Sequence, residues 1–252
     1  MKKFVCIAAV VSMFGSLAGC AAEPAEPTGS STSSIIGGVS DPGHPSVGLL
    51  RSVVQITPDG QPYAVAGCTA TLIAPSVMVT AAHCVAGRHY WDEVSFEQAP
   101  DPFAPHGAPG WIPAALMASP DYDGDTSHGH DIAVVLLGAR PDRPLSPVAA
   151  PPPVGSILTA VGYGMNVYGS DGTGAGERRT VDIPLVSVGP REMIAGREGQ
   201  GTCHGDSGGP LFAGDVIVGI TSYGDTVDCN GADHFMRVDD NLAFLRRFVP
   251  TL

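Results

Sequence analysis

Apolar residues in this chain recur in short runs and in alternation, and seldom at the three- and four-residue spacing of an amphipathic helix. Gly, Pro, Asp and Asn separate the runs, as turn residues separate strands. The run at 132–137 is apolar throughout, which is typical of a strand buried on both faces. The expected strands are 47–54, 68–73, 77–80, 132–137, 157–161, 210–212 and 216–222.

The C-terminal end has a different pattern. Leu242, Leu245 and Phe248 repeat at helical spacing, so the sequence predicts a final helix with Asp239 or Asp240 as its cap. Elsewhere the 33 Gly and 23 Pro fit a turn-rich, all-β chain. The proline-rich stretch 140–153 lacks alternation and is expected to be a long connection.

The N-terminus carries the pattern of an export signal. Two lysines precede an apolar run at 4–17, which is too short to span a membrane. Leu17-Ala18-Gly19-Cys20 resembles the lipobox of bacterial lipoproteins, which implies a signal at 1–19, lipidation of Cys20 and a membrane anchor, at the outer membrane or cell surface. The alternative is ordinary secretion with cleavage near Ala22.

Composition then limits the partners. Residues 20–34 hold no large apolar side chain and are expected to form a flexible tether. From residue 35 onward there are 11 arginines, no lysine and 23 acidic residues, and the whole chain has a net charge of −12. This acidity argues against nucleic-acid binding, because phosphates would be repelled.

Three short segments carry the candidate chemistry. Ser207 lies in Gly-Asp-Ser-Gly-Gly-Pro, His83 in Thr-Ala-Ala-His-Cys, and Asp131 in His-Asp-Ile-Ala. A serine hydroxyl is a poor nucleophile unless a base takes its proton, and the base needs a buried carboxylate to fix its tautomer. The glycines beside Ser207 permit close approach of a substrate to the backbone.

These segments, in the order His, Asp, Ser, resemble those of the chymotrypsin/trypsin-like serine peptidases, and the resemblance covers about residues 35–252. It implies an all-β fold of two antiparallel Greek-key β-barrels and a C-terminal helix, with the first barrel at 35–145 and the second at 146–252. It also implies a monomeric endopeptidase that acts on polypeptides without a cofactor or metal.

The resemblance assigns the catalytic roles. His83 would act as base and then as acid, Asp131 would orient it, and Ser207 would form the acyl-enzyme. The backbone N–H groups of Gly205 and Ser207 would form the oxyanion hole. Ser222 would hydrogen-bond the triad aspartate.

The resemblance also assigns the substrate-binding residues. The segment 222–224, with Tyr223 and Gly224, would pair with the substrate backbone as an added strand. Gly201 falls at the pocket-base position where trypsin has aspartate, followed by Thr202. Asp233 aligns with the opposite side of the pocket floor, as in crustacean collagenolytic peptidases, and predicts a broad preference for Arg or Lys. If Asp233 is instead solvated, a chymotrypsin- or elastase-like pocket is expected.

Activation is the point where the chain departs from the family pattern. Ile35-Ile36-Gly37-Gly38 resembles a mature N-terminus, whose ammonium would pair with Asp206. Relatives have Arg or Lys before the cut, whereas Ser33 and Ser34 precede it here. This departure argues against a trypsin-like activator and leaves two alternatives, activation by a different peptidase or no activating cut.

The six cysteines fit an exported protein. One lies in the signal and Cys20 at its end, and the remaining four allow three connectivities. The resemblance implies the pairs Cys68–Cys84 and Cys203–Cys229, which leaves Cys20 free for lipid.

Other interpretations are weaker. The segment 128–131 lacks a recognised set of metal ligands, and the acidic run 121–125 lacks the glutamate that closes a calcium loop. His204 is expected at the cleft rim. A non-catalytic binding protein on the same fold is the main alternative in function. An esterase of the α/β-hydrolase type has the wrong residue order.

Overall fold

The computed structural model describes residues 35–164 and 176–252. The predicted signal (1–19), the tether (20–34) and Cys20 lie outside these residues. Within the described ranges, no helix is long and apolar enough to cross a membrane. The predicted fold class is confirmed, because strands dominate and form two closed antiparallel barrels.

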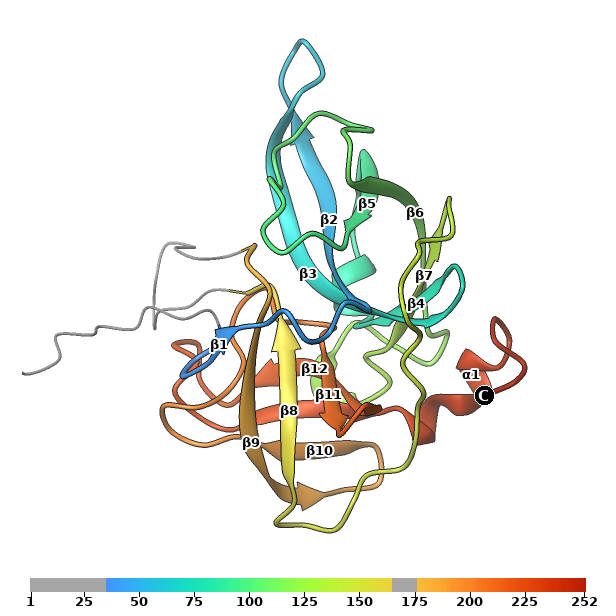
Figure 1. Ribbon diagram of the computed structural model, residues 1–252. Helices are drawn as coiled ribbons and strands as arrows, with labels where there is room; N and C mark the ends of the chain where they lie inside the picture. The colour runs from blue at the N-terminus through green and yellow to red at the C-terminus, as the bar shows by residue number, and fades with distance from the viewer. Residues whose placement is uncertain (1–34, 165–175) are drawn as a thin grey trace, which may run out of the picture. The chain divides into compact units, whose positions relative to one another are not determined.

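The first barrel is drawn from blue to green in Figure 1. Its strands close into a ring in the order β2-β3-β4-β7-β6-β5. Its members are β2 (Val47–Ile56), β3 (Pro62–Ala74), β4 (Val77–Thr80), β5 (Trp91–Ser95), β6 (Trp111–Ala118) and β7 (Ala133–Leu137).

The second barrel is drawn from yellow to red in Figure 1. Its ring runs β9-β10-β13-β12-β11-β8 and closes because β8 also pairs with β9. The short strand β1 (Val39–Ser40) joins this barrel at β9, although it precedes the first barrel in sequence. The other members are β8 (Ile157–Gly162), β9 (Arg179–Val188), β10 (Glu192–Ala195), β11 (Pro210–Ala213), β12 (Val216–Gly224) and β13 (Asp233–Arg237).

Two apolar clusters fill the molecule. One fills the second barrel and includes Ile35, Leu211 and Phe235. The other fills the first barrel and extends to Phe212 and the C-terminal helix. Leu211 and Phe212 therefore face different clusters, so β11 is buried on both faces, between the second barrel's interior and the junction with the first.

The C-terminal helix is shorter than the pattern suggested, and the predicted cap is wrong. A 3₁₀ turn, Asp239–Asn241, leads into α1 (Leu242–Leu245), and neither segment has a side-chain cap. Asp239 instead accepts two hydrogen bonds from Arg237, from Nε at 3.0 Å and from Nη2 at 2.7 Å. A bidentate guanidinium contact satisfies this carboxylate better than one backbone N–H does.

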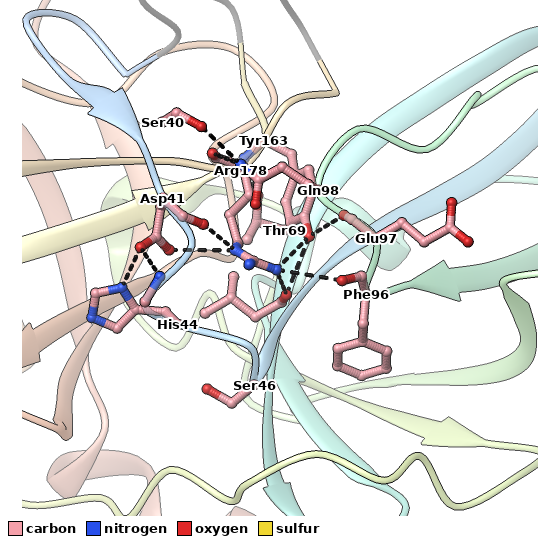
Figure 2. Close-up of polar contacts among 12 residues, drawn as sticks. Ser40, Asp41, His44, Ser46, Thr69, Phe96, Glu97, Gln98, Tyr163 and Arg178 are labelled. Carbon is pink, nitrogen blue, oxygen red and sulfur yellow. Dashed lines mark hydrogen bonds and ion pairs between the residues drawn. The ribbon is translucent and has the colours of Figure 1, made fainter.

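A buried arginine joins the N-terminal segment to both barrels (Figure 2). Arg178 Nε lies 3.3 Å from Asp41 Oδ2, and both side chains are almost fully buried. Arg178 Nη1 also donates to the Phe96 carbonyl of the first barrel and to the Tyr163 hydroxyl of the second. His44 contacts the other Asp41 oxygen at 2.9 Å. One guanidinium thus satisfies groups from three parts of the chain.

Removing this guanidinium should destabilise the fold strongly. Arg178→Met leaves Asp41 Oδ2, which has no hydrogen-bond donor among the described residues, buried without its ion-pair partner. We expect the free energy of unfolding in urea to fall by about 3–5 kcal/mol. The double variant Arg178→Met/Asp41→Asn should lose clearly less, and Arg143→Ala, at an exposed position, about 0.5 kcal/mol or less. Equal losses in the single and double variants would contradict this account.

Candidate active site

The pairing of β4 with β7 brings His83 and Asp131 together. Thr80 lies opposite Ala133 in this antiparallel pair, so the residues after β4 meet those before β7. His83 Nδ1 lies 2.7 Å from Asp131 Oδ2, and the His83 backbone N–H donates to Oδ1 at 2.8 Å. This two-point contact fixes the imidazole relative to a fully buried carboxylate.

Ser222 completes the surroundings of that carboxylate from the second barrel. Its hydroxyl donates to Asp131 Oδ2. Burial by itself raises the pKa of Asp131, but the hydrogen bonds from His83 and Ser222 and the charge of His83 outweigh it and hold the pKa below its usual value. Asp131 therefore stays ionised beside His83.

Ser207 lies in a loop whose glycines adopt backbone conformations that other residues disfavour. Gly208 has a φ of +80°, and a Cβ there would lie 2.0 Å from Thr80 Oγ1. Gly205 has a φ of +96°. The backbone N–H groups of Gly205 and Ser207 donate to no acceptor among the described residues, so both remain available to a ligand.

Ser207 and His83 line one cavity of about 610 Å³ between the barrels. The predicted residues Thr202, Ser222, Tyr223, Gly224 and Asp233 line it too, and exposed His204 lies at its edge. The loop 122–126 also lines the cavity, with Tyr122, Gly124, Asp125 and Thr126, and this contribution was not predicted from the sequence. Nothing in the local pattern of that loop indicated which way its side chains point.

Asp233 is part of the cavity wall, whereas the predicted residue Gly201 does not line the cavity and instead lies against the Asp233 carboxylate. Asp233 is only 3% exposed, lines the cavity, and accepts a hydrogen bond from the Thr202 backbone N–H at 2.6 Å. A Cβ on Gly201 would lie 2.5 Å from Asp233 Oδ2, so Gly201 leaves the space that this carboxylate fills. Burial raises the pKa of Asp233 to about 7.

The two disulfides are those that the resemblance implied. Cys68–Cys84 joins β3 to the 3₁₀ turn that begins at His83, and Cys203–Cys229 joins the Ser207 loop to the far wall of the cavity. The sulfurs of Cys68 and Cys84 lie near His83. Because they are bonded to each other, they are not available as metal ligands.

The segment expected to be the mature N-terminus is already buried in the uncut chain. Ile35 is fully buried, and the Gly201 backbone N–H donates to the Ile36 carbonyl at 3.2 Å. Asp206 is also fully buried and accepts hydrogen bonds at 2.8 Å from the backbone N–H groups of Gly164 and Cys203. Burial raises the pKa of Asp206 to about 7.

Comparison with known proteins agrees with this geometry. Residues 44–245 match the family model described as Trypsin. The chain belongs to the trypsin family. It is 30% identical over 179 residues to the trypsin-like protease of Streptomyces glaucescens, an alignment that covers 63% of this chain and 65% of that protein. It is 28% identical over 195 residues to brachyurin of Leptuca pugilator, with 68% and 82% covered.

A third relative is the trypsin of Saccharopolyspora erythraea, 28% identical over 191 residues that cover 69% of this chain and 81% of the relative. The family assignment makes the protein a serine-type endopeptidase, and the two disulfides are consistent with export.

The buried carboxyl of Asp206 predicts a pH dependence of stability. Its pKa is about 7 in the fold against an ordinary value of 3.8, so between these pH values the folded chain keeps a proton that the unfolded chain releases. The free energy of unfolding therefore falls as pH rises from about 4 to 7. When the uncut chain is unfolded in urea at several pH values, the decrease in the free energy of unfolding should be smaller in Asp206→Asn than in the wild type, by up to about 4 kcal/mol.

Asp215→Asn, at an exposed position, is the matched control and should keep the wild-type slope. If Asp206→Asn also kept that slope, the carboxyl would not carry a raised pKa.

Proposed function

We propose that the protein hydrolyses peptide bonds through an acyl-enzyme on Ser207, as a monomer and without a cofactor. The observation that carries the proposal is the two-point contact of Asp131 with His83, beside a cavity that also exposes Ser207. Asp131 holds the proton on Nδ1 and leaves Nε2 free to act as a base. An esterase reaction would use the same groups, but the family acts on peptides.

Each step uses a group of this chain. His83 takes the proton of Ser207 Oγ as that oxygen attacks the scissile carbonyl carbon. The backbone N–H groups of Gly205 and Ser207 bind the oxyanion that forms. His83 then gives the proton to the leaving amine, and a water molecule, deprotonated by His83, releases the acyl group from Ser207.

We propose that Asp233 directs cleavage to bonds that follow Arg or Lys. The cavity position of its carboxylate supports this, because a buried acid gains from pairing with a cationic side chain. The cavity is also lined by carbon-rich groups such as Val227 and the Cys203–Cys229 disulfide, which would tolerate apolar side chains as well. The substrate backbone would pair with the segment 222–224 as an antiparallel strand.

The arrangement of the cavity wall argues against a non-catalytic binding protein. A binding protein has no use for two unsatisfied N–H donors beside a serine and a fixed histidine, all on the wall of one cavity. Such an arrangement serves a developing negative charge.

Peptide substrates that differ only in the residue before the scissile bond test the mechanism and the pocket together. Ser207→Ala should lower kcat by about 10⁶-fold. Asp233→Gly should lower kcat/KM for Arg and Lys by about 30-fold or more, with little change for Leu or Phe. The matched variant Gly201→Asp/Asp233→Gly moves the acid across the pocket floor and should recover selectivity for Arg and Lys. If Asp233→Gly lowers kcat/KM for all peptides equally, Asp233 has no role in selectivity.

We further propose that Cys20 carries a lipid and that cleavage before Ile35 both activates and releases the enzyme. In this proposal the chain consists of a signal (1–19), a tether (20–34) and two barrels (35–145 and 146–252). Because all four cysteines of the catalytic part are paired, no disulfide can hold the tether after the cut. The new ammonium of Ile35 would pair with buried Asp206.

Cell fractionation with activity measurement tests this coupling. The uncut protein should be in the membrane fraction and inactive, and the active form should be soluble with Ile35 as its first residue. Cys20→Ala should move the uncut protein out of the membrane fraction without activating it. Full activity of uncut, membrane-bound protein would contradict the coupling.

A further inference from the structure

A buried histidine lies directly behind the substrate-binding wall. His234 in β13 follows Asp233 in sequence and lies opposite Tyr223 of β12 in the antiparallel register. The two rings stack with their centroids 4.1 Å apart and an angle of 12° between their planes. Tyr223 lines the cavity and His234 does not, so His234 can affect a substrate only through its neighbours.

Both ring nitrogens of His234 face carboxylates. Nε2 lies 3.0 Å from Asp225 Oδ1, and Asp225 lines the cavity. Nδ1 lies 3.3 Å from Glu192 Oε2 in β10, the same oxygen that accepts a hydrogen bond from the Tyr223 hydroxyl at 3.0 Å. Neither carboxylate forms a salt bridge with an arginine in the part of the chain that the structure describes.

The number of donors decides which form of the ring suits this site. A neutral imidazole has one N–H, whereas the imidazolium has two. The imidazolium can donate from Nε2 to Asp225, and its charge also attracts Glu192, although Nδ1 forms no hydrogen bond among the described residues. The same charge is favoured over the Tyr223 ring. When the ring is neutral, one carboxylate faces a nitrogen lone pair and loses its contact.

We propose that His234 is a positioning residue, whose protonation holds Tyr223 and Asp225 in place for substrate residues upstream of the scissile bond. This inference rests on the proposed function of the same cleft. It predicts that long peptides bind more tightly at low pH, whereas ligands confined to the pocket do not show this effect.

The effect of His234 protonation on binding must be distinguished from the effects of the titratable groups beside it. Asp233 precedes it in sequence and has a pKa raised by burial to about 7, but its protonation affects every ligand with a basic side chain in the pocket. Burial, the hydrogen bond to Glu192 and the charges of Asp225 and Asp125 raise the pKa of Tyr223 to about 12. Tyr223 therefore keeps its proton at neutral pH.

Binding to the Ser207→Ala variant, cut before Ile35, tests the inference without turnover. Two ligands are compared by calorimetry at pH 6 and pH 8.5: a tetrapeptide amide ending in Arg, and an acetyl-arginine amide that fills only the pocket. Because both ligands place Arg in the pocket, protonation of Asp233 changes both Kd values, and its effect cancels in their ratio. We expect the tetrapeptide to lose about three- to tenfold in relative affinity from pH 6 to pH 8.5, the size of one lost charge-assisted hydrogen bond.

Adding His234→Phe keeps a stacked ring but removes both nitrogens, so the ratio of Kd values should no longer change with pH. Glu192→Gln, at a half-buried position, is a second variant in case His234→Phe does not fold. It should also reduce the change, because an amide can pair with either form of the ring. A pH-independent ratio in the Ser207→Ala parent, an unchanged response in the folded variants, or no binding of the tetrapeptide would overturn the inference. Failure of the proposed function would appear separately, as absence of peptide cleavage by the protein with Ser207.

Discussion

The geometry of the active site depends on one threonine at the junction of the barrels. Thr69 of β3 donates its backbone N–H to the Ser207 carbonyl at 2.8 Å and its hydroxyl to the Gly205 carbonyl at 3.0 Å. The same hydroxyl accepts a hydrogen bond from the Tyr163 backbone N–H at 3.1 Å. Because His83 belongs to the first barrel and Ser207 to the second, these bonds fix the distance across which a proton must pass. The neighbouring disulfide Cys68–Cys84 ties β3 to the turn that holds His83 within the first barrel.

The buried carboxylates Asp131, Asp206 and Asp233 differ in what satisfies them. Asp131 already has its partner, a histidine, and its pKa is lowered. Among the described residues, Asp206 and Asp233 accept hydrogen bonds from neutral donors only, and burial raises their pKa values to about 7. Each of these two sites is favourable for a cation that the uncut, unliganded chain lacks. In our proposal the cation is the Ile35 ammonium at Asp206 and a substrate side chain at Asp233.

Apolar runs and turn residues allowed an all-β chain and most strands of the first barrel to be predicted. The two-barrel fold and the disulfide pairs followed only from the family resemblance of short motifs, because the cysteines alone left three connectivities open. The expected strands did not include β1, β5, β6, β9, β10 or β13. In β6 and β9 a proline lowers the strand signal. In β9 the alternation of Val181, Ile183 and Leu185 was nonetheless present and could have indicated it. The cap of the final helix was predicted wrongly because Arg237 competes for Asp239.

The remaining features depend on contacts between distant segments. The role of Thr69 and the contacts of His234 with Glu192 arise from strand pairings that no local pattern reveals. The direction of the Asp233 side chain was open for the same reason, since it depends on the register of β13 against β12.

The most direct test of the account is covalent labelling of the protein cut at Ile35 with a peptidyl fluorophosphonate ending in Arg, followed by peptide mapping. The account predicts one adduct per chain, on Ser207, formed rapidly with wild-type protein and at least about 100-fold more slowly after His83→Ala, because the serine then lacks its base. An adduct on another residue, or a labelling rate that does not depend on His83, would contradict the assignment of Ser207 as the activated nucleophile.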